Sequence, residues 1–161
     1  MQTIETKSLK VGKYVNTAHV DTVIRNYKQE RWVHNSERIG KEDSLSAWWS
    51  VEELEGFIEH AKTHGADGVK FYFAAYDKES APMPEYEDRQ TLVMVATKQK
   101  ENADGTTKNK DIYITTDKGT NIVAYNAGQL CPPFCGQSQE HDNIEIGITI
   151  VDAGDKGFVV I

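Results

Sequence analysis

Two cysteines in the C-terminal part of the chain are its most reactive side chains. Cys131 and Cys135 flank a Pro-Pro-Phe spacer, which is stiff because each proline fixes its own φ angle. A disulfide needs Cα atoms within about 7 Å of each other, so it requires a tight turn, since a polyproline conformation would hold them about 12 Å apart. Zinc would need two further ligands, for which His141 and Asp142 are the nearest candidates, although the spacing is not a standard zinc pattern. Free thiols in a structural turn, a disulfide, and a metal site with Cys131, Cys135 and His141 are therefore three open alternatives.

Two other groups of residues have a composition that could bind a metal or transfer protons. His60 and His64 stand four apart on a predicted helix, a spacing that lets two imidazoles share a metal. Glu85, Glu87 and Asp88 lie in a proline-containing loop, where carboxylates could bind a cation or act as acid and base. The histidine pair lacks the glutamate of a metalloprotease motif, and no second group of residues aims the carboxylates at a substrate. We therefore interpret the histidines as solvated helix residues, with His64 favoured by the helix dipole, and the carboxylates as a solvated loop.

The paired tryptophans could also take part in binding. Trp48 and Trp49 could stack on a sugar or a base, but both lie beside the start of a predicted helix, so we expect them in the core. The chain has no nucleophile elbow, Walker loop or dinucleotide-binding fingerprint. Catalysis therefore lacks a recognisable motif, and we expect no cofactor.

Composition limits the classes of partner. The chain has 161 residues, with 18 basic and 25 acidic side chains and a net charge of -7. Nucleic acid is an unfavourable partner because phosphate binding needs a concentrated basic surface. No apolar run approaches the roughly 18 to 20 residues that span a bilayer, and the polar opening Met1–Lys13 lacks the apolar stretch of a signal peptide. With only two cysteines, these features predict a soluble, cytoplasmic protein that binds neither nucleic acid nor membrane, with a periplasmic location after processing as the alternative.

The other elements are organised around the stretch from Ser44 to Asp77. Ser50 followed by Glu53 is a capping box, so a helix should begin at Val51 and end at Gly65, which can adopt the left-handed conformation that terminates helices. The apolar stripe of this helix comprises Val51, Leu54, Phe57, Ile58 and Ala61. Alternation then predicts a strand from Val69 to Ala75 that packs against the helix.

A second amphipathic helix precedes this unit, and strands follow it. Thr17 or Asn16 can cap a helix whose stripe ends near Trp32, after which the polar run between Val33 and Ser46 is predicted as a connection. A loop from Lys78 to Gln90 precedes the strands, which are predicted at Thr91–Thr97, Asp111–Thr115, Ile122–Tyr125, Ile144–Val151 and Phe158–Ile161. The first of these is apolar on both faces, so we expect it in the centre of a sheet. An Asp-Gly pair predicts a hairpin after it.

These elements predict an α+β fold. Helices come early and strands then run consecutively, which favours two amphipathic helices packed on one face of a largely antiparallel sheet of five or six strands. The length suits a single domain over residues 1–161. Within it, we expect a core over residues 14–136 and a C-terminal β-hairpin over residues 144–161.

Three segments carry a resemblance to a known family. They are NYK at Asn26–Lys28, GADGVKFYFAAY at Gly65–Tyr76 with TLVMVAT after it, and CPPFCG at Cys131–Gly136. In their order and spacing they resemble a family of small uncharacterised bacterial proteins, chiefly from Bacteroidetes, whose most specific motif is the CPP-x-C turn. The resemblance covers roughly residues 14 to 136. It implies a common core but no activity, and the segment from Ile144 onward lies outside it.

Two functional classes follow from these observations. The first is a non-enzymatic interaction module that associates with itself or with a protein partner through open sheet edges. The alternative is a metal-assisted hydrolase or a thiol redox protein that uses Cys131, Cys135 and His141.

Overall fold

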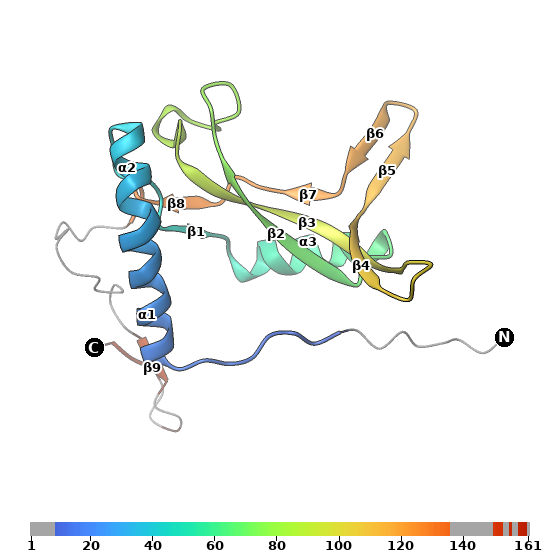
Figure 1. The fold of residues 1–161 in the computed structure, drawn as a ribbon, viewed down its shortest axis with the longest axis horizontal. Helices are drawn as coiled ribbons and strands as arrows, with labels where there is room; N and C mark the ends of the chain where they lie inside the picture. The colour runs from blue at the N-terminus through green and yellow to red at the C-terminus, as the bar shows by residue number, and fades with distance from the viewer. Residues whose placement is uncertain (1–8, 136–149, 153–154, 156–157, 161) are drawn as a thin grey trace.

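The structure is a computed structural model that describes residues 9–135, 150–152, 155 and 158–160. Helices and strands both contribute, and every strand pairing in these residues is antiparallel, so the expected α+β class is confirmed. A long N-terminal helix stands at one end of the molecule, while most of the strands and helix α3 (Val51–Thr63) form a separate body beside it (Figure 1).

The N-terminal helix continues where a connection was predicted. Helix α1 spans Thr17–Tyr27, a π-helical turn η1 spans Lys28–Trp32, and α2 runs on over Val33–Ile39 without a break. Gly40 ends the helix with a left-handed φ of 73°. The prediction of a connection between Val33 and Ser46 was therefore wrong for its first seven residues.

The physical reason lies in the π turn and in the contacts that hold α2. A π turn has more residues than an α turn, so it shifts which later positions face the body and breaks the 3.6-residue periodicity. Trp32 Nε1 donates a hydrogen bond of 2.8 Å to the carbonyl of Asp43, and the Asp43 N–H donates one of 2.9 Å to Ser36 Oγ. Hydrogen bonds therefore hold this part of the helix to the following segment, and they leave no apolar stripe in the sequence from which the helix could be predicted.

Helix α3 begins and ends where the sequence predicts. The N–H of Glu53 donates to Ser50 Oγ at 3.1 Å, and the Ser50 N–H donates back to Glu53 Oε2 at 3.0 Å, which completes the capping box. Gly65 follows the helix with φ of 82°. Both terminal signals are thus confirmed.

The buried face of α3 is narrower than the predicted stripe. Phe57 and Ala61 are buried and belong to one core cluster with Met94 of the sheet, whereas Val51 and Ile58 remain exposed. The helix therefore packs on the sheet through only part of its apolar stripe, and the rest of the stripe is exposed to solvent.

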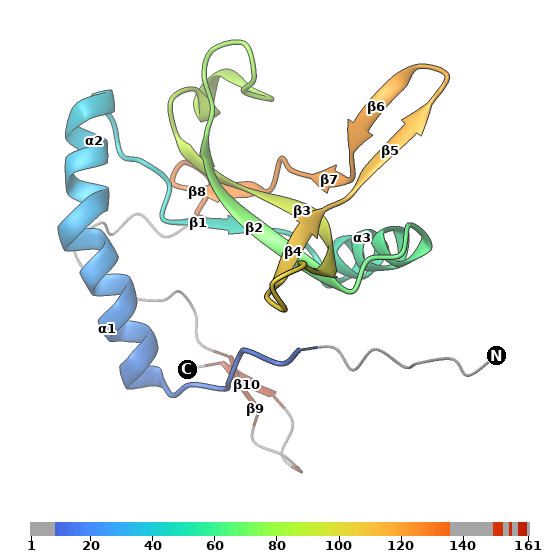
Figure 2. The same ribbon diagram turned by 45° about the vertical axis from the view of Figure 1, so that its right-hand side comes forward.

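The main sheet has four strands. Strand β2 (Gly68–Ala75) pairs with β3 (Gln90–Glu101), and the opposite side of β3 pairs with β4 (Thr107–Asp111) and β7 (Ala124–Tyr125). The central position expected for the strand around Thr91–Thr97 is confirmed, and the Asp-Gly pair forms the β3–β4 turn. Figure 2 shows β2 at the edge of this sheet, whereas α3 contacts the sheet at the central strand β3.

The remaining strands form two-stranded pairs rather than extending that sheet. They are β1 (Ser46–Trp48) with β8 (Gln129–Cys131), β5 (Tyr113–Thr116) with β6 (Gly119–Ile122), and β9 (Ile150–Asp152) with β10 (Phe158–Val160). The described residues therefore contain one four-stranded sheet and three pairs in place of the expected single sheet of five or six strands. Alternation predicts that a segment is a strand, but it does not specify which strands become neighbours.

The predicted C-terminal hairpin is described only in part. β9 and β10 pair antiparallel, with Val151 opposite Val159. Most of the predicted isoleucine strand from Ile144 onward lies outside the described residues. The division into a core over residues 14–136 and a hairpin over residues 144–161 stays a prediction.

Two apolar clusters hold the body together. The larger lies between α3 and the sheet and contains Trp49, Phe57, Ala61, Met94, Ala96 and Val123. The smaller contains Tyr76 and Tyr86 of the loop between β2 and β3, together with Leu130 of β8. Because burying a large apolar side chain stabilises the fold by about 1.5 to 3 kcal/mol, these two clusters are a main source of the stability of the body.

Candidate functional site

The cysteine turn contains a disulfide. Cys131 and Cys135 are bonded, with their Cα atoms 4.7 Å apart. The turn is closed by a 2.9 Å hydrogen bond from the Phe134 N–H to the Leu130 carbonyl, and Gln129 Nε2 donates to the Phe134 carbonyl at 3.1 Å. Phe134 is 42% exposed, so its side chain is only partly covered. Of the three alternatives for the cysteines, the structure contains the disulfide.

The disulfide changes the expectations about metal and compartment. A metal binds thiolates, so a site with Cys131, Cys135 and His141 would require the reduced state. His141 lies outside the described residues, and this metal site stays a prediction. Disulfides persist mainly in oxidising compartments, so the bridge does not favour the expected cytoplasmic location.

The other predicted polar residues lie mostly at the surface. The rings of His60 and His64 lie 4.8 Å apart edge to face at the surface. Glu85 and Asp88 are also exposed, and Glu87 is half-buried. In the described part of the chain, no three His, Cys, Asp or Glu side chains come together as a metal site would require.

The two tryptophans have different environments. Trp49 is buried in the larger core cluster, as predicted, but Trp48 is 60% exposed on β1, so its expected place in the core was wrong. Successive side chains of an extended segment point in opposite directions, which explains why the pair separates. Gly128 leaves room for the buried indole, because a Cβ atom there would lie 2.6 Å from it.

The proline-containing loop is anchored from within. Tyr86 is buried, its ring stacks 6.1 Å from that of Tyr76, and its hydroxyl accepts a hydrogen bond of 3.0 Å from the Leu130 N–H. The Tyr86 ring also lies 5.8 Å from that of Phe134. The loop between β2 and β3 and the cysteine turn therefore form one unit.

A buried polar group joins the long helix to the sheet. Asp43 is buried, and its Oδ1 accepts hydrogen bonds from the N–H groups of Gln90 at 2.7 Å and Ser44 at 2.8 Å. The Tyr27 hydroxyl donates to Gln90 Oε1 at 2.6 Å. Burial raises the pKa of Tyr27, and the nearby negative charge of Asp43 raises it further. These residues fix the distance between the long helix and the start of β3.

Two grooves lie between the long helix and the sheet. The first, of about 230 Å³, is largely apolar and is lined by Val23 and Tyr27 of α1, Leu45, and Phe73 and Leu92 of the sheet. The second, of about 450 Å³, is more polar. Its lining includes Arg38 and Ile39 of α2, Ala74 and Ala75 of β2, and Asp88. Phe73 and Gln90 line both grooves, so the two meet beside the C-terminal half of β2.

Hydrogen bonds on β3 show which way the backbone groups of β2 point. The Ala96 N–H donates to the Val123 carbonyl at 2.9 Å, and the Ala96 carbonyl accepts from Ile112 at 3.0 Å. Both groups of Ala96 therefore point away from β2. Val69 stands opposite Ala96 in the register. In an antiparallel ladder such a pair exchanges no hydrogen bonds, so the N–H and C=O of Val69 point to the outer edge.

The outer edge of β2 is unpaired and aromatic. By the same alternation as Val69, the backbone N–H and C=O groups of Phe71, Phe73 and Ala75 point outward, and no strand in the described residues pairs with them. Phe73 is 84% exposed and Phe71 is 49% exposed. An eight-residue edge strand with exposed aromatic side chains is the kind of edge that recruits another strand.

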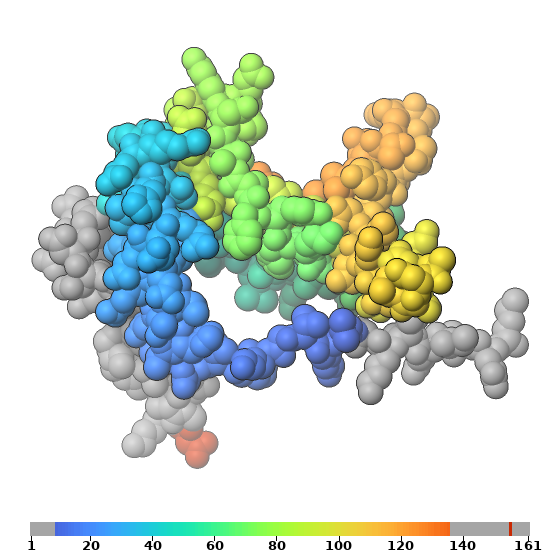
Figure 3. All heavy atoms as spheres, viewed as in Figure 1, coloured from blue at the N-terminus to red at the C-terminus, as the bar shows by residue number. Residues whose placement is uncertain are grey.

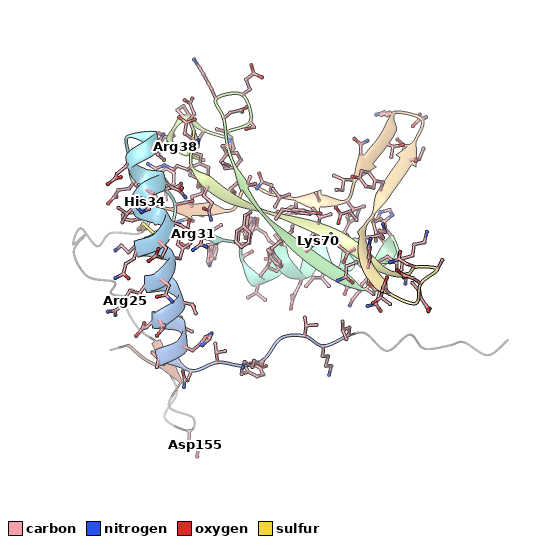
Figure 4. All side chains as sticks on the ribbon, in the orientation of Figure 1. Arg25, Arg31, His34, Arg38, Lys70 and Asp155 are labelled. Atoms are coloured by element: carbon pink, nitrogen blue, oxygen red, sulfur yellow. A yellow bond between two sulfur atoms is a disulfide. The ribbon has the colours of Figure 1, made fainter. Side chains whose placement is uncertain are left out.

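A charged cluster occupies the N-terminal half of β2. Lys70 Nζ donates to Asp111 Oδ1 at 2.7 Å, and the Tyr72 hydroxyl donates to Asp111 Oδ2 at 2.6 Å. Hydrogen bonds from Lys70 and from Tyr72 lower the pKa of Asp111. Lys70 lies toward β4 and Arg38 lies on α2, near opposite ends of the strand (Figure 4). Lys70, the one charged residue of β2, is thus neutralised within the fold.

Sequence reasoning missed the main features of this site. Nothing in the pattern distinguishes the buried Asp43 or Tyr86 from neighbouring polar loop residues. The edge position of β2 follows only from its pairing. Its aromatic run Phe71–Phe73 gave no sign of an edge, because apolar residues on both faces of a strand are typical of a central strand.

Comparison of the chain with models of protein families, with curated proteins and with solved structures finds no match. The resemblance to the Bacteroidetes family therefore stays a prediction. None of the helices in the described part of the chain is long and apolar enough to cross a bilayer.

Proposed function

We propose that this chain is a non-enzymatic interaction module that binds a protein strand along the free edge of β2. The observation that carries the proposal is the outward row of backbone groups at Val69, Phe71, Phe73 and Ala75, together with an 84% exposed Phe73. Main-chain hydrogen bonds to such an edge supply affinity, and alternate side chains supply specificity. The partner is another copy or a different protein.

The surroundings of the edge support a bound strand. Beside the C-terminal half of β2, the groove of about 450 Å³ leaves space between the strand and α2. In the neighbouring apolar groove, an apolar side chain of the bound strand would contact Val23 and Leu45. With a net charge of -7 and no basic surface expected, nucleic acid is not part of the proposal.

A matched pair of variants tests the proposal. Phe73→Lys places a charge on the edge, and Tyr113→Lys makes a similar change at a 60% exposed aromatic residue of β5. Both side chains are largely exposed, so each change should alter the free energy of unfolding by no more than about 0.5 kcal/mol. Sedimentation over a concentration series, with affinity capture from native extract, should show association that only Phe73→Lys weakens. Equal association by all three proteins, or none by the wild type, would contradict the proposal.

A thiol redox function is the second candidate, because the Cys131–Cys135 bridge ends at an exposed Cys135. It predicts that the bridge exchanges with glutathione or reduces a test disulfide, which thiol titration measures. A bridge that stays oxidised in a glutathione buffer, with no bound metal after reduction, would leave the cysteines with a structural role.

A further inference from the structure

We propose that the strand received by β2 is the N-terminal arm, residues 9–15, of a second copy of this chain. The inference rests on the proposed function, because it names the partner for the same edge. It adds the identity of the bound strand, which is a segment of this chain with unpaired backbone groups and apolar side chains.

The N-terminal arm is extended and uncovered. Its sequence is LKVGKYV, and it carries no helix or strand of its own. None of its backbone groups takes part in a hydrogen bond within the described residues. Val11 is 86% exposed, and Tyr14 is fully exposed. Figure 3 shows the arm leaving the foot of α1 as a thin extension, with open space between it and the sheet.

The arm and the edge match in length and in hydrogen-bonding capacity. Seven extended residues span about 23 Å, and the eight residues of β2 span about 26 Å, at about 3.3 Å per residue. Within the part of the chain that the structure describes, each side has backbone N–H and C=O groups without partners, so pairing them would complete a second ladder on β2. The apolar residues of the arm would then lie next to Phe71 and Phe73.

Charge also favours this pairing. The arm carries Lys10 and Lys13 and no carboxylate, in a chain of net charge -7. Asp67 and Asp77 flank β2 on either side. The lysine of β2 is already bonded to Asp111, so its charge is compensated and opposes the lysines of the arm little.

The arm of the same copy cannot cover the whole edge. It joins the fold at Thr17, whereas the groove beside Ala75 is lined by Asn35 and Arg38. At 1.5 Å per helical residue, Asn35 lies about 27 Å along the helix from Thr17, which exceeds the roughly 23 Å that the arm spans. A second copy has no such restriction. The contact joins unlike surfaces, so it closes as a reciprocal dimer or continues as a chain of copies.

The test uses full-length chains, and each variant disrupts either the arm or the edge of β2. Val11→Asp disables the arm, and Val51→Asp is its control, since Val51 is also exposed and begins α3, where an acidic residue is favourable. Phe73→Lys disables the edge. Sedimentation of each chain alone should show self-association at least tenfold weaker for Val11→Asp and for Phe73→Lys, and unchanged for Val51→Asp.

Mixing the two disabled chains completes the test. The Val11→Asp chain keeps an intact edge and the Phe73→Lys chain keeps an intact arm, so the mixture should form a mixed complex that neither chain forms alone. If Val11→Asp associates like the wild type while Phe73→Lys does not, the edge binds something other than the arm, and this inference fails while the proposed function stands. The same holds if the wild type is monomeric but captures a partner that Phe73→Lys loses. If Phe73→Lys associates like the wild type, both fail.

Discussion

Reduction of the Cys131–Cys135 bridge should lower the free energy of unfolding by about 2 kcal/mol. The bridge closes a loop with a sequence separation of only 4. For a loop of that size, the chain-entropy relation gives about 6 cal/mol/K, which is about 2 kcal/mol at 25 °C. The effect is at the lower end for disulfides because a short loop loses little entropy on closure. The hydrogen bonds of the turn, such as that from Phe134 to Leu130, remain after reduction.

Denaturant melts with and without reductant measure this difference. The Cys131→Ser, Cys135→Ser double variant is the control: it should unfold like the reduced wild type and should not respond to reductant. Titration of the denatured wild type should find no free thiols. Two free thiols would show that the bridge does not form in solution. Identical melts under both conditions would show that the bridge does not stabilise the fold, which would contradict the entropy argument.

Three further predictions concern the core, the buried polar group and the charged cluster. Phe57→Ala should destabilise the fold by about 3 to 5 kcal/mol in denaturant melts, because the ring is buried between α3 and the sheet; a loss below 1 kcal/mol would mean that α3 is not packed there. Asp43→Ala should cost at least about 2 kcal/mol, since it leaves the buried N–H groups of Ser44 and Gln90 without an acceptor; a neutral change would contradict that role. The pKa of Asp111 is lowered in the folded state, so its contribution is present above the unfolded pKa of about 3.9 and is lost as the pH falls through the folded pKa. Unfolding free energies measured below pH 5 should therefore fall less steeply for Asp111→Asn, and equal slopes would refute the pairing.

Local signals in the sequence predicted local structure well. The capping box at Ser50 and Glu53, the glycine at 65 and the Asp-Gly turn are each read from neighbouring residues, and each forms as predicted. The central strand was also predictable, because apolar residues on both of its faces require burial on both. These features depend on contacts between residues close in the sequence or on burial alone.

Features that depend on pairing between distant residues were not predictable. The extension of the first helix to Ile39 relies on a π turn and on hydrogen bonds to Asp43. The exposure of Trp48 depends on the pairing of β1 with β8. The candidate site was not predictable for the same reason. The segment around Phe73 was correctly predicted as a strand, but its free edge depends on the order of the strands in the sheet.

Amide hydrogen exchange along β2 tests the central claim most directly. The N–H groups of Lys70, Tyr72 and Ala74 point toward β3 and should be protected at any protein concentration. Those of Phe71 and Phe73 point outward, so they should exchange rapidly in dilute solution and become protected when copies or a partner bind. Outward amides that still exchange rapidly in the associated protein would contradict strand addition at this edge.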